Sequence, residues 1–200
     1  MTKNIDGNDI FHASDRKSWR SWLKTNHNTE KGVWLIFYKT NSGKAGVNYA
    51  EAVEEALCYG WIDSRKKKLD ESRSIQFFSP RKLKSYWSSI NKERVAKLIG
   101  QRKMTRAGKE VVDLAIKNGS WDALNEVDKI IIPDDLQIAL KENDAASEHF
   151  AAFPKSSKKI ILTWILNAKT PATRIKRIVE TVNLATRNIR ANHYSSPKGK

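Results

Sequence analysis

Residues 56–94, ALCYGWIDSRKKKLDESRSIQFFSPRKLKSYWSSINKER, are the stretch of sequence that decides the expected fold. An amphipathic helical segment ends at Gly60, a residue that readily adopts the left-handed conformation found after helix ends. Residues 61–68 then have the composition of a strand, residues 70–72 supply turn chemistry, and residues 74–78 return as a second strand. The stretch therefore predicts a two-stranded cationic hairpin.

The sequence after the hairpin has the pattern of a helix start, with Ser79 as N-cap and Pro80 at the first helical position. Arg81, Lys82 and Lys84 would then lie beside the positive end of the helix dipole, where free N–H groups attract anions. We expect a phosphate or carboxylate site here; the alternative is a short turn with solvated lysines. The helix would align the residues spaced by three and four, namely Lys84, Trp87, Ser88, Asn91 and Arg94.

Two helices and one strand are predicted before the hairpin, and the second of these helices is the one that ends at Gly60. Asp15 can cap a helix that buries Trp19, and residues 32–38 have the pattern of a buried strand. Asn48 followed by Glu51 resembles a capping box that opens an amphipathic helix. The outer face of that helix is expected to be acidic and to carry Glu51, Glu54 and Glu55.

A glycine-rich segment, Gly-Lys-Ala-Gly at residues 43–46, precedes that helix. It lacks the spacing of the phosphate loop found in nucleotide-binding proteins. We therefore interpret it as a plain surface loop.

The C-terminal part of the chain has only helical signals. An acidic region at residues 120–144 marks the expected boundary and contains a helix signal from Pro133. Residues 160–166 are apolar nearly all round and are expected to form the central buried helix, while Pro171 opens a last helix. The apolar stripe of that last helix is expected at Ile175, Ile178, Val179, Val182 and Ala185.

Together these elements predict an α+β fold. We expect an N-terminal mixed domain with a small antiparallel sheet and packed helices over residues 1–128, an all-helical module over residues 129–194, and a disordered tail over residues 195–200. A hydrophobic content of 40% that includes seven Trp is enough for a core. Because no apolar run approaches the roughly 20 residues of a membrane helix, no membrane insertion is expected.

The net charge of +15 is unevenly distributed along the chain. Residues 1–64 are neutral, residues 65–109 carry +12, residues 110–154 carry −7 and residues 155–200 carry +10. Two basic blocks flanking an acidic one indicate either complementarity within the fold or cationic surfaces for an anionic partner. Ordinary solvated lysines are the plainer explanation.

Cysteine and histidine usage narrows the chemistry. The single Cys58 excludes an intramolecular disulfide, fits a reducing cytoplasm and is expected to be a small core residue. Four scattered histidines lack the spacing of metal ligands, so we expect no metal and no cofactor. The polar N-terminus has no apolar export signal, which also predicts a cytoplasmic location. The sequence does not fix the oligomeric state.

Several spaced motifs resemble the bacterial YdeI/OmpD-associated family, and the resemblance extends over nearly the whole chain. They are EALCYGWIDS at residues 55–64, QFFSPR at 76–81, SYWSSINKER at 85–94, and FPKSSKK at 153–159 with the helical residues up to 178. The resemblance implies a label of bacteriocin or antimicrobial-peptide protection and a periplasmic location, but no catalytic residues. Since a protein of +15 repels cationic peptides, we expect an indirect role in stress resistance rather than direct sequestration.

The favoured function is a binding module for an anionic ligand, either a phosphate-bearing small molecule or a nucleic acid. Lys and Arg interleaved with aromatic residues suit both partners. The candidate ligand-binding residues are Trp61, Asp63, Ser64, Arg65, Gln76, Arg81, Lys84, Trp87, Ser88, Asn91 and Arg94.

Two other functions stay open from the sequence. A small-molecule enzyme would use a polar cleft around Asp63, Arg81 and Trp87, with Asp63 as a weak candidate for a catalytic base. Local backbone capping explains Asp63 equally well. An interaction protein would instead use the basic C-terminal helix, with Arg174, Lys176, Arg177, Arg187 and Arg190 as its surface.

Overall fold

The computed structural model describes residues 5–39 and 42–193 of the chain. Two compact units are found, Met1–Asp122 and Ala123–Lys200. The division falls after Asp122 rather than after residue 128, because the short helix α5 (Asn125–Asp128) packs against α8 (Lys155–Leu166) of the second unit. The tail expected at residues 195–200 lies outside the described residues.

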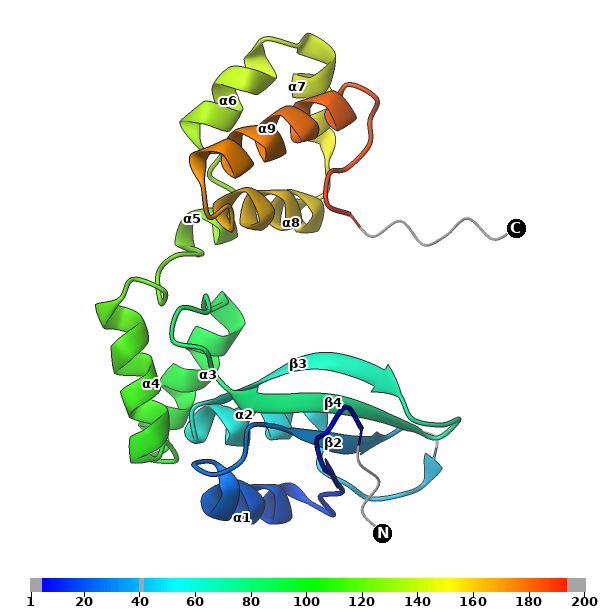
Figure 1. Ribbon diagram of the computed structural model, residues 1–200, viewed down its shortest axis with the longest axis vertical. Helices are drawn as coiled ribbons and strands as arrows, with labels where there is room; N and C mark the ends of the chain where they lie inside the picture. Colours follow the sequence, from blue (N-terminus) through cyan, green and yellow to red (C-terminus); the bar gives the residue numbers. More distant parts are fainter. Residues whose placement is uncertain (1–4, 40–41, 194–200) are drawn as a thin grey trace. The chain divides into compact units, whose positions relative to one another are not determined.

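The first unit combines a sheet with helices, and the second contains only helices among its described residues (Figure 1). The elements of the first unit are β1 (Ile10–Phe11), α1 (Arg16–Asn26), β2 (Val33–Tyr38), α2 (Tyr49–Cys58), β3 (Trp61–Lys68), β4 (Arg73–Pro80), α3 (Ser89–Gly100) and α4 (Arg106–Lys117). After α5, the second unit continues with α6 (Asp134–Lys141), α7 (Asp144–Ala152), α8 and α9 (Pro171–Ala185). The predicted α+β class is confirmed.

Four strands form one mixed sheet in the order β1-β2-β4-β3. The predicted hairpin is present as β3 and β4, and β2 pairs antiparallel with β4. The sequence suggested an antiparallel sheet. The observed sheet is mixed, because the short β1 pairs parallel with β2. Gly60 has a φ of +74° at the turn between α2 and β3, which is the left-handed conformation expected there.

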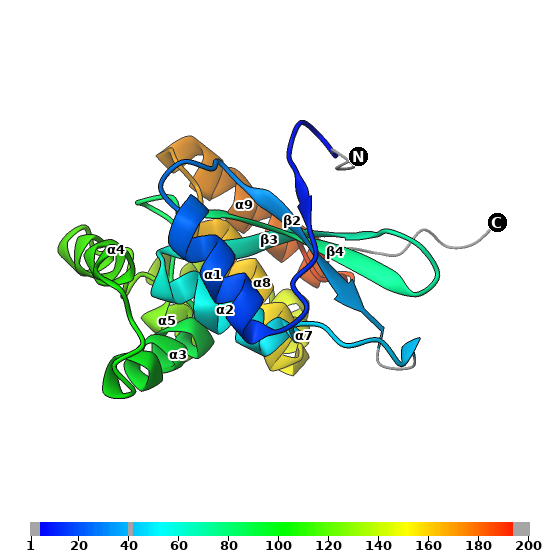
Figure 2. The same cartoon turned by 90° about the horizontal axis from the view of Figure 1, so that it is seen from below.

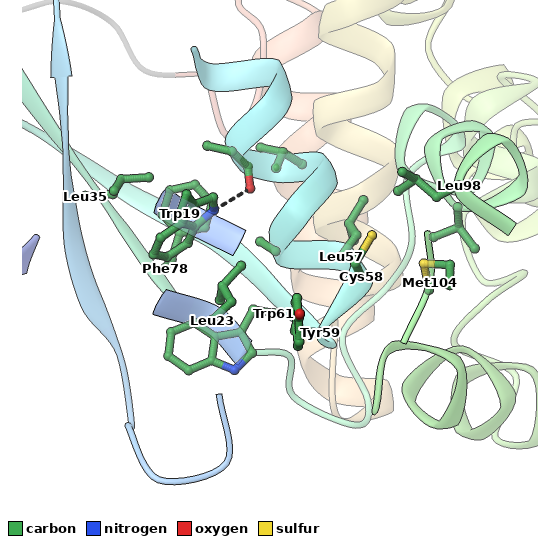
Figure 3. Close-up of a cluster of buried hydrophobic side chains, with 14 of the residues drawn as sticks. Trp19, Leu23, Leu35, Leu57, Cys58, Tyr59, Trp61, Phe78, Leu98 and Met104 are labelled. Atoms are coloured by element: carbon green, nitrogen blue, oxygen red, sulfur yellow. Dashed lines mark hydrogen bonds between the residues drawn. The ribbon is translucent and has the colours of Figure 1, made fainter. Parts of the chain in front are cut away.

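Helices α1 and α2 cover one face of the sheet (Figure 2). Trp19 and Leu23 lie one turn apart on α1, and both are completely buried in the cluster drawn in Figure 3. Trp19 Nε1 donates a hydrogen bond of 3.0 Å to the carbonyl oxygen of Ala52 on α2. Both helices begin where the sequence predicted, since Asp15 and Asn48 each form a capping box.

The prediction that Glu55 lies on an exposed acidic face of α2 is wrong, because this residue is only 2% exposed. Its carboxylate accepts hydrogen bonds of 2.6 Å from Arg16 Nε and 2.6 Å from Arg20 Nη1, both on α1. Periodicity placed Glu55 on the polar side of α2, but α1 supplies two guanidinium groups to that side. A charged residue is therefore buried with its partners.

The helix predicted to begin at Ser79 and Pro80 does not exist. Both residues belong to β4, where Pro80 pairs with Trp61, and the next helix begins only at Ser89 with Ser88 as its cap. Pro80 is tolerated in the strand because the pairing of β2 with β4 ends at Phe78, so no ladder bond on that side needs its missing N–H. The helix N-terminus that was expected to attract an anion is therefore absent from this position.

The opposite face of the sheet carries a second, smaller apolar cluster of Trp34, Ile36 and Ile75. The N-terminal segment closes over it, since Trp34 Nε1 donates a hydrogen bond of 3.1 Å to the carbonyl oxygen of Ile5. Lys67 on β3 forms an ion pair of 2.7 Å with Asp6. This face is therefore covered by apolar residues and bordered by paired charges.

The second unit has a core of its own, formed largely by α6 to α9. Helix α8 is not buried all round, because Ile160 is 38% exposed while Ile161 and Ile165 are fully buried. The stripe predicted on α9 is also narrower than expected: Ile178 and Ala185 are buried, but Ile175 and Val179 are about half exposed or more. These helices are amphipathic, with one buried side each.

Candidate functional site

The candidate site is a pocket of about 970 Å³ in the first unit, on the face of the sheet that α1 and α2 cover. Its floor consists of β2, β3 and β4, and its wall consists of the segment before α2 and the first residue of that helix. The lining residues are Phe37, Tyr38, Lys39, Lys44, Gly46, Val47, Asn48, Tyr49, Lys66, Ser74 and Gln76. A volume of this size accommodates an ordinary metabolite.

Three lysines line this pocket, Lys39, Lys44 and Lys66, and no aspartate or glutamate is among the lining residues. None of the three forms an ion pair with a carboxylate within residues 5–39 and 42–193. The Lys44 ammonium lies 5.6 Å from the centre of the Tyr38 ring, a cation–π contact that holds it over the pocket wall. The pocket is therefore positively charged.

A β-bulge in β3 directs one of these lysines into the pocket. Asp63 pairs with Phe78 and Lys66 pairs with Gln76, so two residues of β3 oppose a single residue of β4 between them. In a regular strand Asp63 and Lys66 would point to opposite faces, because side chains alternate. The extra residue places both on the face that carries Gln76 and Phe78.

The segment before α2 is fixed by Val47. This side chain is only 3% exposed, and its backbone N–H donates a hydrogen bond of 3.2 Å to the carbonyl oxygen of Ala13. The Asn48 cap follows directly, so the start of α2 and the wall of the pocket are set by the same two residues.

Hydrogen bonds to Asp63 order two of the lining residues. Its Oδ2 accepts hydrogen bonds of 2.8 Å from the Tyr49 hydroxyl and 2.9 Å from Gln76 Nε2, and both donors line the pocket. Loss of water around the hydroxyl and its bond to Asp63 raise the pKa of Tyr49 to about 12, while the charge of Arg94 opposes that shift. Arg94 therefore lies near the same cluster.

Arg81 occupies the neighbouring position beside Trp87. Its guanidinium lies 3.8 Å from the centre of the Trp87 ring, Nη2 donates to the carbonyl oxygen of Tyr86, and the residue is only 8% exposed. Nε is buried without a partner among the described residues. Burial lowers the pKa of Arg81 to about 10, and the negative charge of Asp63 opposes this effect. Arg81 thus packs as part of the core while its charge stays close to Asp63.

The structure brings together part of the predicted site. Asp63, Gln76 and Arg81 are neighbours, and Gln76 Nε2 also donates a hydrogen bond of 2.9 Å to the backbone oxygen of Ser64. The remaining members are local to α3: Ser88 caps the helix, and Arg94 Nη1 donates a hydrogen bond of 3.0 Å to Asn91 Oδ1.

Three predicted site residues are placed elsewhere. Trp61 is buried in the core and donates through Nε1 to the backbone oxygen of His27 at 3.1 Å. Arg65 lies on the opposite face of the sheet, 5.2 Å from the centre of the Phe77 ring. Lys84 is exposed and lines no part of the pocket. The structure therefore does not bring these three residues to the pocket.

Sequence reasoning missed Lys39, Lys44 and Lys66 as a group. Lys44 belongs to the segment at residues 43–46 that was interpreted as a surface loop, and Lys66 was counted only as part of a cationic hairpin. The signal that could have found them is the absence of acidic residues from positions 31–50 and from the middle of β3. That signal is weak without knowledge of the bulge.

Metal-ligand clusters and membrane-spanning helices are both absent from the part of the chain that the structure describes. No group of three His, Cys, Asp or Glu residues is arranged to hold a metal ion there. Within the same residues, no helix combines the length and apolar character needed to span a membrane.

Comparisons with known proteins assign the two parts of the chain to different families. Residues 129–188 match the family described as bacteriocin-protection, YdeI or OmpD-associated, which confirms the resemblance for that part. Residues 11–111, which include the whole pocket, match a domain of unknown function (DUF8412). No curated protein and no solved structure matches the chain. The chain therefore belongs to the DUF8412 family, and its residues 129–188 are similar to the YdeI/OmpD-associated family.

Proposed function

We propose that the first unit binds a small anionic organic molecule, bearing a phosphate or carboxylate group, in the pocket between the sheet and the start of α2. The observation that carries this proposal is the lysine set Lys39, Lys44 and Lys66, which lines one pocket with no carboxylate among its walls. Three ammonium groups without acidic partners repel one another, and a bound anion relieves that repulsion.

The walls of the pocket favour an organic anion over a bare inorganic ion. Phe37, Tyr38 and Tyr49 contribute aromatic surface, and the accessible surface of the pocket is partly polar and partly apolar. A ligand that buries apolar surface against these rings gains affinity that a free phosphate ion lacks. The proposed ligand therefore has a carbon skeleton as well as a negative charge.

A nucleic acid is a weaker candidate for the partner. Two of the aromatic residues that were candidates for base stacking, Phe78 and Trp87, are 0% and 2% exposed and belong to the core. The cations of the basic blocks remain and can contact phosphates, but the burial of these two rings removes part of the support for base stacking.

The alternative of an enzyme with a cleft around Asp63, Arg81 and Trp87 gains no support from the pocket described above, because none of the three residues lines it. The third alternative, an interaction protein that uses the basic surface of α9, loses support because two arginines of that surface contact other residues of the same unit. Arg174 donates two hydrogen bonds to Asp135, and Arg177 packs on Trp164. Anion binding in the first unit is the reading that the contacts favour.

The role of this binding in the cell is part of the proposal. The description of the family matched by residues 129–188 names bacteriocin protection. A net charge of +15 disfavours direct capture of cationic peptides, so we propose an indirect role in stress or antimicrobial-peptide resistance that depends on the bound anion. The cytoplasmic location stays a prediction.

Isothermal titration with phenyl phosphate tests the proposed function. The variant K39Q/K44Q/K66Q is expected to bind at least about tenfold more weakly than the parent, since each lysine supplies a charge-assisted contact. The matched control is K17Q/K24Q/K109Q, which removes the same charge from exposed lysines outside the pocket. Equal losses in both variants, or no binding to the parent protein, would contradict the proposal.

A further inference from the structure

The orientation of the Gln76 amide is fixed by its two partners. Nε2 donates hydrogen bonds of 2.9 Å to Asp63 Oδ2 and 2.9 Å to the backbone oxygen of Ser64. Both partners are acceptors, so the atom that faces them must be the NH2 group and not the carbonyl oxygen. The carbonyl oxygen Oε1 is therefore the amide atom that these two partners do not engage.

Oε1 of Gln76 receives no hydrogen bond from any residue that the structure describes. The residue is only 7% exposed, yet it lines the pocket. Oε1 is not among the buried side-chain atoms that lack a partner, so it keeps some accessible surface, and a ligand that displaces water from it without donating a hydrogen bond loses that interaction. The NH2 group cannot turn away to relieve this, because both of its protons are already engaged. The pocket therefore presents one fixed acceptor that no described residue pairs.

Other groups around the pocket restrict the donor that can pair with it. Lys39, Lys44 and Lys66 disfavour a positively charged donor by repulsion. Among the described residues, Asp63 is the carboxylate that is hydrogen-bonded to Gln76, and its Oδ2 already accepts two hydrogen bonds. A neutral O–H or N–H group is the donor that fits.

We propose that the ligand of this pocket is an anion that also carries a neutral hydrogen-bond donor, which pairs with Gln76 Oε1 while the negative group meets the lysines. This inference rests on the proposed anion-binding function and adds a rule of specificity to it. The chemical class comprises hydroxylated or N–H-bearing organic acids and phosphate esters. Anions without such a donor leave Oε1 unpaired and bind more weakly.

The first experiment uses the unmodified protein and matched probes. Calorimetric affinities are compared for phenyl phosphate, its 3-hydroxy and 4-hydroxy derivatives, and the corresponding methoxy derivatives, which have similar bulk but no donor. At least one hydroxy derivative is expected to bind about three- to tenfold more tightly than phenyl phosphate and than its methoxy counterpart, because it gains one hydrogen bond to an acceptor that those probes leave unpaired.

The outcomes separate this inference from the function on which it rests. If phenyl phosphate binds through the pocket lysines but neither hydroxyl group improves affinity, the donor rule is wrong and anion binding stands. If phenyl phosphate does not bind at all, both are wrong.

The second experiment observes the amide directly. The chain contains three glutamines, Gln76, Gln101 and Gln137, of which the last two are exposed, so the side-chain amide signals of a 15N-glutamine sample are few. The Gln76 signal should shift with the tighter hydroxy probe and stay in place with inorganic phosphate. In Gln76→Leu the preference for hydroxy over methoxy probes should fall to about onefold. An unmoved Gln76 signal in the parent protein overturns the proposal even if that variant fails to fold.

Discussion

Tyr49 on α2 and Asp63 on β3 are joined by a hydrogen bond of 2.8 Å from the hydroxyl to Oδ2. This contact connects the first residue of the helix, which lines the pocket, to the strand that carries the bulge. The same Oδ2 accepts from Gln76. Asp63 therefore acts as the anchor that orients both pocket-lining donors, and it need not take part in any chemical step.

Replacement of Tyr49 by Phe removes one of the two hydrogen bonds to Asp63 Oδ2 and keeps the ring. We expect a loss of about 0.5–1.5 kcal/mol in the free energy of unfolding. Urea denaturation measures this, and Tyr86→Phe is the control because its hydroxyl has no recorded partner in the described part of the chain. A loss of equal size in the control would show that the bond to Asp63 contributes nothing specific.

The pKa of Tyr49 predicts how its contribution depends on pH. The folded-state pKa of about 12 exceeds the ordinary value of 10.0, so the neutral hydroxyl is favoured by folding. Its stabilising contribution is complete below pH 10.0 and is lost as the pH rises through about 12. Absorbance titration of tyrosinate should show a late step that is missing from Tyr49→Phe. A titration that is unchanged in this variant would contradict the assignment.

The close approach of α4 to the end of α2 predicts an unusual response at Gly108. A Cβ atom there would lie 2.3 Å from the backbone oxygen of Cys58 and 2.7 Å from that of Leu57. Gly108→Ala should destabilise the protein by about 1–3 kcal/mol, although Ala is the better helix former by about 1 kcal/mol.

The matched control for that variant is Gly100→Ala, at the last position of α3, where a Cβ atom meets nothing within 4 Å. It should leave stability unchanged or raise it by up to about 1 kcal/mol. Thermal unfolding of the two variants checks the pair. If both changed stability in the same direction, the contact between α4 and α2 would not be as tight as described.

Glu55 is the residue whose replacement should cost most among the charged positions. Its carboxylate is 3% exposed and joins Arg16 and Arg20, so Glu55→Gln removes the carboxylate partner of Arg20 and leaves Arg16 paired with Glu54 alone. We expect a loss of about 3 kcal/mol in the free energy of unfolding. Glu110→Gln, which breaks the exposed pair with Arg106, should cost less than about 0.5 kcal/mol. Similar losses in the two variants would mean that the Glu55 cluster is not a structural one.

The sequence by itself determined those elements whose signals lie within a few residues. Asp15 and Asn48 cap helices because their side chains reach N–H groups three positions ahead, and the hairpin of β3 and β4 follows from alternating strands around the turn that contains Asp70. The same local logic failed at Ser79 and Pro80. An N-cap pattern there competes with pairing to β3, and the energy of that pairing depends on residues far from the pattern.

Only the tertiary structure decided where the site lies. Lys39, Lys44 and Lys66 come from three separate segments, and a bulge of one residue decides whether Lys66 faces the pocket or the opposite side. The free oxygen of Gln76 likewise depends on two acceptors contributed by another strand. Register and orientation arise from the balance of pairing and burial across the sheet, which the order of residues along one strand does not contain.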